Sequence, residues 1–334
     1  MDMHAGAASA AGSVSVIDAT LERVSRARAA IGEVIFGQDR VVERTLITLL
    51  SGGHGLLVGV PGLAKTKLVE TLGVVMGLDA LRVQFTPDLM PSDILGAEVM
   101  EETPERGRAF RFIKGPIFAQ LLMADEINRA SPRTQSALLQ AMQEHHVTVA
   151  GTRHDLPAPF HVLATQNPLE QEGAYPLPEA QLDRFLMQID VDYPDREAER
   201  RIVVETTGAS QAKARPAMTA AELMIAQDLV RRAPIGEKIV EAILDLVRAA
   251  RPDQGDAKID KLVAWGPGPR AAQALALASR ARALVDGRAA PSLADVAALA
   301  EPILKHRMAL SFAARADGET VTSVVKRLVA EKLG

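Results

Sequence analysis

The chain has 334 residues, of which 48% are hydrophobic, 24% are charged and only 3% are aromatic, and its formal net charge is -4. This length and composition indicate a globular protein of about two domains with an ample core. The sequence contains no cysteine, which excludes disulfides, thiolate metal sites and cysteine nucleophiles. The scarcity of aromatic side chains and the acidic balance argue against a protein that binds nucleic acid by stacking on its bases.

Residues 1–16 are small and polar, and they lack the basic start and the apolar run of a signal peptide. We therefore expect a disordered lead-in there. No stretch of the sequence approaches the roughly 18 uninterrupted apolar residues that a membrane span needs. The expectation is a cytoplasmic protein without a membrane span.

The next part of the chain alternates short apolar runs with segments of helical spacing. Helices are predicted at residues 17–35, 41–50, 65–76 and 131–143. Strands are predicted at residues 55–59, 81–85, 117–124, 161–165 and 186–191, with a β-hairpin at residues 146–160 that turns near Ala150 and Gly151. Residues 86–115 contain several prolines, glycines and charges and are predicted to be irregular. The alternation of strands and helices indicates the α/β class, with a parallel sheet and helices on its faces.

The composition changes after about Glu205, where a small, polar, proline-containing segment is typical of a linker. Strand signals are absent beyond it. Helices are predicted from residue 219 and at residues 236–251, 270–286, 293–310 and 321–333. Two of them begin with capping boxes, at Thr219 and at Ser292. We assign residues 17–208 to the α/β domain and residues 209–334 to a small all-helical domain.

A phosphate-binding loop is predicted between the first strand and the helix after it. The segment GVPGLAKT, Gly59–Thr66, departs from the pattern G-x-x-x-x-G-K-[ST] only at Ala64, where the second glycine is expected. In such a loop Lys65 would reach the outer phosphates of a nucleotide and Thr66 would hold Mg²⁺. Alanine is tolerated there if the loop needs no positive φ. The residues that we expect to bind the nucleotide are Gly59, Pro61, Gly62, Leu63, Ala64, Lys65, Thr66 and Lys67. The plainer interpretation is a glycine-rich turn.

Polar side chains end two later strands. In AQLLMADEINRA, Asp125 and Glu126 follow an apolar run, so that they would lie beside the phosphate loop at the carboxyl end of a parallel strand. There Asp125 would orient Mg²⁺ through the waters bound to the ion, and Glu126 would polarise the attacking water. Asn167 follows another apolar strand and would hold the water or sense the γ-phosphate. The alternatives are an exposed acidic strand end and an ordinary turn residue before proline. The order and context of the motifs favour nucleotide hydrolysis.

Two arginines are candidates for a catalytic role. Arg184 ends the segment PEAQLDR, and Arg270 stands at the start of a predicted helix in the second domain. An arginine placed on the γ-phosphate is worth about 10³–10⁵ in rate. The usual alternative is an arginine solvated at the surface.

Taken together, these segments resemble the MoxR family of AAA+ ATPases over residues 34–301. The most specific segments are GVPGLAKT, KGPIFAQLLMADEINRASPRTQSALLQAMQE and ATQNPLEQEGAYPLPEAQLDRF. The resemblance implies that Gly37 and Gln38, in IFGQ, lie beside the adenine of ATP.

The resemblance also implies roles for single polar residues. Asn167 would be the first sensor, and Arg270, in GPGPRA, would be the second sensor acting in cis. Arg184 is the best match to the finger that acts in trans on a neighbouring subunit. Arg129 and Arg200 are alternatives for that finger.

In fold and assembly, the resemblance implies an AAA+ phosphate-loop domain, a helical lid and a homo-hexameric ring with ATP and Mg²⁺ at the subunit boundaries. Residues 86–115 would carry the helix-2 insertion of this clade and residues 147–155 a hairpin, both facing the centre of the ring. The family implies a chaperone-like remodeller of a protein client in protein maturation or metal-cofactor insertion, with a partner that bears a von Willebrand factor A domain.

Three other functions share parts of this pattern. One is a motor acting on nucleic acid, against which the acidic pI and few aromatics argue. Another is the motor subunit of a metal chelatase, which has much the same core. The last is a scaffold that binds ATP with negligible turnover, and the presence of Glu126 argues against it.

Overall fold

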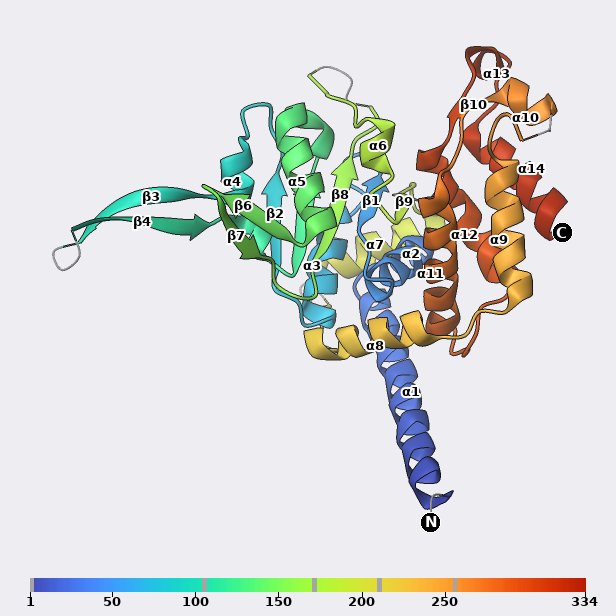
Figure 1. The fold of residues 1–334 in the computed structure, drawn as a ribbon, viewed down its shortest axis with the longest axis horizontal. Coiled ribbons are helices and arrows are strands. Elements are labelled where there is room, and N and C mark those ends of the chain that lie inside the picture. The colour runs from blue at the N-terminus through green and yellow to red at the C-terminus, as the bar shows by residue number, and fades with distance from the viewer. Residues whose placement is uncertain (1–2, 104–106, 170–172, 209–211, 255–256) are drawn as a thin grey trace.

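The computed structural model describes residues 3–103, 107–169, 173–208, 212–254 and 257–334. A five-stranded parallel sheet with helices on both faces forms its centre (Figure 1). The strands, in the order in which they pair, are β2 (Ala80–Gln84), β5 (Leu121–Asp125), β8 (His161–Gln166), β1 (Gly55–Val58) and β9 (Met187–Asp190). Because all five are parallel, their carboxyl ends meet at one edge of the sheet, here called the carboxyl edge, and their amino ends meet at the amino edge. The predicted α/β class is confirmed.

Successive side chains of each strand point to opposite faces of the sheet and pack into two different hydrophobic cores. On β1, Leu57 packs into the core on one face and Leu56 into the core on the other. The first face is covered by α1 (Met3–Gly32), α2 (Asp39–Leu50) and α3 (Lys65–Val75), and the second by α4 (Pro91–Leu95) and α5 (Pro132–Glu144). All five residues of β5 are buried, as expected for a strand covered on both faces.

The helix α1 is longer than the sequence predicts. It begins at Met3, so residues 3–16 are helical where a disordered lead-in is expected. Alanine is frequent in this segment and has the highest helix propensity, which explains the extension. The helix projects from the body (Figure 1), while Val24, Ala27 and Ile31 near its other end are buried. Within the described ranges, no helix has both the length and the apolar character needed to cross a membrane.

A second difference is the hairpin of β3 (Gly96–Thr103) and β4 (Gly107–Lys114), which lies where an irregular segment is expected. The two strands pair antiparallel along their whole length and project from the sheet domain (Figure 1). Such a ribbon leaves both faces partly solvated, so it accommodates the charged residues that hide the strand pattern. The other predicted hairpin is confirmed by β6 (His146–Val149) and β7 (Thr152–Asp155), joined by Ala150 and Gly151 with left-handed φ values of 48° and 82°.

The rest of the chain is mostly helical, and the capping boxes at Thr219 and Ser292 are both present. Its helices are α8 (Ala220–Arg232), α9 (Glu237–Ala249), α10 (Ala257–Leu262), α11 (Pro269–Val285), α12 (Leu293–Leu304), α13 (Phe312–Ala316) and α14 (Val321–Leu333). Two short strands, β10 (Val263–Trp265) and β11 (Ala309–Leu310), pair antiparallel between them. The all-helical expectation therefore misses this small ribbon, whose strands are too short to give a period.

A buried carboxylate ties the helical domain to the sheet domain. Asp295 is completely buried and accepts hydrogen bonds from Arg282 Nη1 at 2.7 Å and Arg288 Nη2 at 2.6 Å. Arg282 Nε also donates to Glu43 on α2 at 3.1 Å. Burial alone would raise the pKa of Asp295, but hydrogen bonds from Arg288 and Ser292 outweigh it and lower the pKa to about 2.

Two buried histidines connect neighbouring elements near the amino edge. His54 Nδ1 accepts the Val162 N–H at 2.9 Å, which leaves Nε2 to donate to the Met142 carbonyl at 3.1 Å. His161 Nδ1 lies 2.8 Å from the Gly53 carbonyl oxygen, and its Nε2 lies 3.0 Å from the amide nitrogen of Gln227. Burial lowers the pKa of His54 to about 3 and that of His161 to about 4, so both imidazoles are neutral.

Candidate functional site

The predicted phosphate loop joins the carboxyl end of β1 to α3 and therefore lies at the carboxyl edge of the sheet. A side chain at Gly59 would place its Cβ 2.5 Å from the Val191 carbonyl oxygen, so the close approach of the residue that follows β9 requires glycine there. Gly62 has a φ of 84°, which also favours glycine. The backbone of this loop is thus fixed by its glycines.

Ala64 adopts a backbone conformation that the sequence pattern does not reveal. Its φ is 56° and its ψ is 21°, which is left-handed, at the N-cap of α3. The condition for a tolerated alanine, a negative φ, is not met. The left-handed conformation costs an L-residue with a Cβ about 1–2 kcal/mol, so Ala64 is strained where the common pattern has glycine.

The acidic pair lies at the end of β5 and is held by a neighbouring strand. Asp125 is buried, and Glu126 follows it with a left-handed φ of 56°. The hydroxyl of Thr165, on β8, donates to Asp125 Oδ1 at 2.5 Å and accepts the Glu126 N–H at 2.8 Å. Thr165 therefore sets the position of both acids. Sequence reasoning missed it because a threonine inside an apolar strand carries no functional signal.

Two other predicted residues complete this edge. The Lys65 ammonium donates to the backbone carbonyls of Gly59 and, at 3.1 Å, Val60, so it lies over its own loop. Asn167 is buried just beyond β8, and its Oδ1 accepts the Leu169 N–H at 3.1 Å.

These groups line one pocket of about 450 Å³. Its residues are Pro61, Gly62, Leu63, Ala64, Lys65, Thr66, Lys67, Arg82, Gln84, Asp125, Glu126, Thr165 and Asn167. The structure thus brings together the predicted loop, the acidic pair and the asparagine, which come from three parts of the chain.

Two members of the pocket, Arg82 and Gln84, come from the edge strand β2. Arg82 donates to Asp125 Oδ2 through Nε at 3.0 Å and through Nη2 at 2.6 Å. Gln84 accepts from Arg82 Nη2 at 2.8 Å and donates to Glu126 Oε2 at 2.6 Å. A signal for them exists in the sequence, because polar residues two apart near the end of a parallel strand share a face at the ligand-binding edge.

The oxygen ligands fit Mg²⁺, which prefers carboxylate, hydroxyl and phosphate oxygens. The Asp125 carboxylate and the Thr66 side chain line the same pocket. Within the described residues, no three His, Asp or Glu side chains are grouped so as to hold a metal ion. The protein oxygens suit an ion that takes its remaining ligands from nucleotide phosphates and water.

Comparisons with known proteins agree with this site. Residues 54–187 match a family model described as the ATPase family associated with various cellular activities (AAA), and residues 256–328 match the AAA lid domain. Chaperone MoxR1 of Mycobacterium tuberculosis is 41% identical over 95% of this chain and 84% of its own length. Protein MoxR of Paracoccus denitrificans is 30% identical over 86% and 89%. A crystal structure of a putative ATPase from Cytophaga hutchinsonii is 35% identical, covers 98% of both chains and has a TM-score of 0.89.

The chain belongs to the MoxR family of AAA+ ATPases. Its parallel sheet with flanking helices and its helical lid are those of an AAA+ protein, as predicted. The match to the lid domain covers residues 256–328, which run from α10 into α14.

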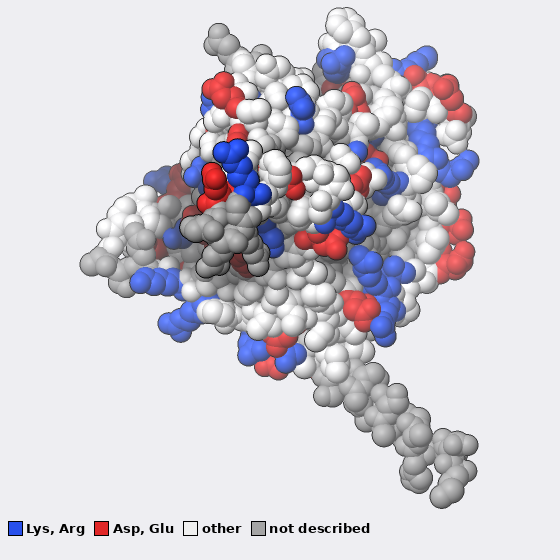
Figure 2. Space-filling view, turned by 60° about the vertical axis from the view of Figure 1, so that its left-hand side comes forward, with Lys and Arg blue, Asp and Glu red and all other residues white. Residues whose placement is uncertain are grey.

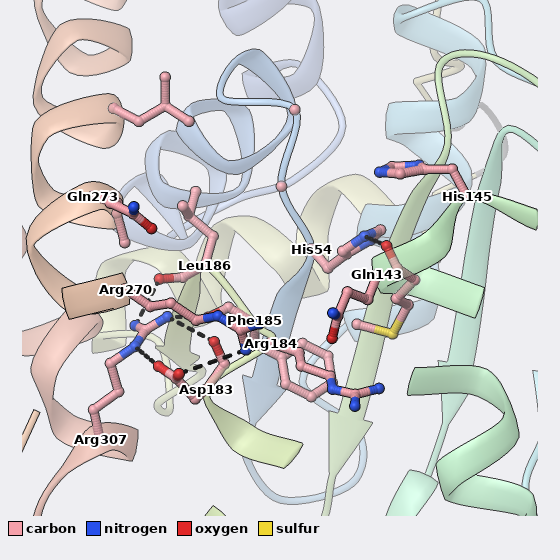
Figure 3. A pocket seen from close by; sticks show the side chains of 15 residues that line it. His54, Gln143, His145, Asp183, Arg184, Phe185, Leu186, Arg270, Gln273 and Arg307 are labelled. Atoms are coloured by element: carbon pink, nitrogen blue, oxygen red, sulfur yellow. Dashed lines mark hydrogen bonds and ion pairs between the residues drawn. The ribbon is translucent and has the colours of Figure 1, made fainter. Parts of the chain in front are cut away.

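In this MoxR-family chain, Arg184 and Arg270 do not line the phosphate-loop pocket as the structure describes it. Both line another pocket, of about 310 Å³, beside residues that precede β1 and β9 (Figure 3). Arg270 Nη1 lies 3.7 Å from Asp183 Oδ2, and Arg307 Nε donates to Asp183 Oδ1 at 2.7 Å. The residues before β1 and β9 place this pocket at the amino edge, and α11 contributes Arg270, Gln273, Ala274 and Leu277 to its lining. The structure therefore does not place Arg270 where a second sensor acting in cis requires it.

The remaining predicted residues lie in three places. Gly37 has a φ of 68° and packs against Ala198, and Gln38 Nε2 donates to the Asp192 carbonyl at 2.9 Å. Their contact with adenine stays a prediction. Of the alternative fingers, Arg129 donates to Glu126 of its own site at 3.1 Å, and Arg200 is exposed on α7 (Arg196–Thr207).

Proposed function

We propose that this chain binds ATP with Mg²⁺ at the carboxyl edge of its sheet and hydrolyses it. The observation that carries the proposal is the single pocket lined by Lys65, Thr66, Asp125, Glu126 and Asn167. These residue types in this arrangement serve phosphoryl transfer, in which positioning and charge stabilisation supply most of the catalysis.

Each side chain has a distinct task in this proposal. Thr66 and Asp125 would hold Mg²⁺, which when bound neutralises charge on the phosphates. Lys65 exchanges its loop carbonyls for the outer phosphate oxygens, and Glu126 accepts a proton from the attacking water. Asn167 hydrogen-bonds that water or the γ-phosphate.

We further propose that Arg184 and Arg270 act on the nucleotide of a neighbouring copy. They lie at the amino edge, whereas the phosphate loop lies at the carboxyl edge. Strands of four to six residues, at about 3.3 Å a residue, separate these edges by roughly 13–20 Å. A ring in which the amino edge of one copy faces the carboxyl edge of the next would complete each site, and a homo-hexamer is the ring that we expect.

The biological role that we propose is chaperone-like remodelling of a protein client, in the cytoplasm, during protein maturation or metal-cofactor insertion. The support is the similarity to a relative named Chaperone MoxR1. A partner with a von Willebrand factor A domain is part of this proposal. On the face in Figure 2, acidic and basic side chains are interspersed rather than gathered into a basic stripe, which does not favour a motor on nucleic acid.

The first test is Glu126→Gln. We expect the variant to bind ATP as the wild type does while hydrolysis falls by about 10²-fold or more, because the general base is lost. The matched control is Glu205→Gln, an exposed residue on α7 that should retain full hydrolysis. Wild-type turnover in Glu126→Gln would contradict the assignment. A pull-down with this variant and ATP would then identify client and partner.

The second test concerns action between subunits. Arg184→Ala should bind ATP without hydrolysing it, and Lys65→Ala should fail to bind it. Mixing the two should restore part of the activity, because a boundary between them combines an intact phosphate loop with an intact arginine. Absence of any restoration, in mixed rings verified by differential tagging, would count against action in trans.

A further inference from the structure

The carboxylate assigned to Mg²⁺ already has a positively charged partner. Arg82 places Nε at 3.0 Å and Nη2 at 2.6 Å from Asp125 Oδ2. The other oxygen, Oδ1, accepts the Thr165 hydroxyl at 2.5 Å. Both oxygens of the carboxylate are therefore occupied, one of them by a full positive charge.

The position of Arg82 follows from the sheet. On β2, Arg82 pairs in register with Met123, and Gln84 pairs with Asp125, so the guanidinium reaches forward along the strand to the carboxylate. Because β2 is the edge strand, half of the Arg82 side chain stays exposed while the Asp125 side chain is 11% exposed. The arginine can therefore leave without opening the core.

Mg²⁺ and the Arg82 guanidinium compete for this oxygen. The lone pairs of Oδ2 that accept from Arg82 are those that Mg²⁺ or one of its bound waters would use, and the like charges of Arg82 and Mg²⁺ repel. Gln84 extends the contact, because it accepts from Arg82 at 2.8 Å and donates to Glu126 at 2.6 Å. A chain of hydrogen bonds thus runs from Asp125 through Arg82 and Gln84 to Glu126.

We propose that Arg82 is the counter-ion of Asp125 in the metal-free protein and that Mg²⁺ entering with the nucleotide displaces it. Arg82 is then a positioning residue that keeps the buried carboxylate neutralised and raises the Mg²⁺ concentration needed to fill the site. Its departure also removes the group that orients Gln84 on Glu126. This inference rests on the proposed function, since it assumes that Asp125 is the magnesium carboxylate.

Arg82→Gln tests the proposal. The readout is the affinity for ADP, measured by titration calorimetry with excess Mg²⁺ and with EDTA, together with the Mg²⁺ concentration at half-saturation. Because the Arg82 guanidinium no longer competes for Asp125, the Mg²⁺ concentration at half-saturation should fall roughly tenfold. This is the size typical for removing one charge-assisted hydrogen-bonded pair. Affinity in EDTA should fall, because the bare carboxylate then repels the phosphates.

The matched control is Arg129→Gln. It removes one positive charge beside the same acidic pair, but Arg129 donates to Glu126 at 3.1 Å and, in the part of the chain that the structure describes, does not hydrogen-bond to Asp125. It should leave the Mg²⁺ half-saturation close to the wild-type value. Circular dichroism of both variants verifies folding, and Arg82→Lys, which keeps the charge, should give an intermediate shift.

The possible results distinguish the counter-ion role of Arg82 from nucleotide binding itself. An unchanged Mg²⁺ half-saturation in a folded Arg82→Gln protein overturns the counter-ion role, as does an equal shift in Arg129→Gln. Equal loss of affinity with and without Mg²⁺ would mean that Arg82 binds phosphate instead. If the wild type binds no nucleotide under either condition, the proposed function itself fails.

Discussion

Lowering the pH from about 7.5 to about 5.5 should destabilise the fold through its buried histidines. Burial lowers the pKa of His54 from 6.5 to about 3 and that of His161 to about 4. In this window the unfolded chain therefore takes up protons that the folded chain does not. The contribution of these neutral histidines to the free energy of unfolding is fully present above the pKa of histidine in the unfolded chain. It is lost progressively as the pH falls below that pKa toward the lower pKa values of the folded protein.

The size of the effect follows from the same pKa values. At about pH 5.5, one unit below the unfolded pKa, each histidine contributes a loss of about 1.4 kcal/mol. His54 and His161 together give roughly 3 kcal/mol. His306, whose pKa burial also lowers, acts in the same direction. Asp295, with a folded pKa of about 2 and an ordinary value of 3.8, keeps its contribution in this window because its stabilisation is lost only at lower pH.

The assay is urea unfolding followed by circular dichroism at several pH values and constant ionic strength. His161→Gln should reduce the loss between the two pH values by about 1.4 kcal/mol, even if the variant is less stable at both. Gln140→Ala, an exposed residue on α5 without a titratable group, is the control and should keep the wild-type pH dependence. A stability that is flat across this window, or an unchanged dependence in His161→Gln, would refute the reasoning.

Two backbone and core substitutions test other parts of the structure. Ala64→Gly should stabilise the nucleotide-free protein by up to about 1 kcal/mol in urea unfolding, because the relief of left-handed strain exceeds the added entropy of the unfolded chain. A clear loss of stability would contradict the strained conformation. Asp295→Ala should cost about 3–5 kcal/mol, since it leaves two arginines partly buried without their carboxylate. A loss below about 1 kcal/mol in the same assay would show that this network contributes little to holding the lid.

The phosphate loop, Asp125, Glu126 and Asn167 could be predicted because each follows an apolar run. In a parallel sheet the ends of such runs meet at one edge, so a one-dimensional pattern indicates a three-dimensional cluster. The fold class followed from the same alternation of strands and helices. These predictions depend only on local periodicity and a general rule about sheets.

Other features depend on packing that no local pattern contains. The place of Arg270 is set by where α11 lies against the sheet domain, which brings it to Asp183 rather than to the phosphate loop. The roles of Arg82 and Thr165 depend on strand order, since β2 and β8 flank β5. The left-handed φ of Ala64 could not be predicted from the sequence, because alanine is a strong helix former and its presence indicates ordinary helical φ values.

The separation of the two arginines from the phosphate loop has a consequence for symmetry. A copy that offers its amino edge to the carboxyl edge of the next uses two different surfaces, so the contact is heterologous. A two-fold dimer cannot satisfy such a contact, and an open row of copies leaves an unfinished site at one end. Only closure under rotation gives every copy a complete site, which makes cyclic symmetry a requirement of the proposed chemistry.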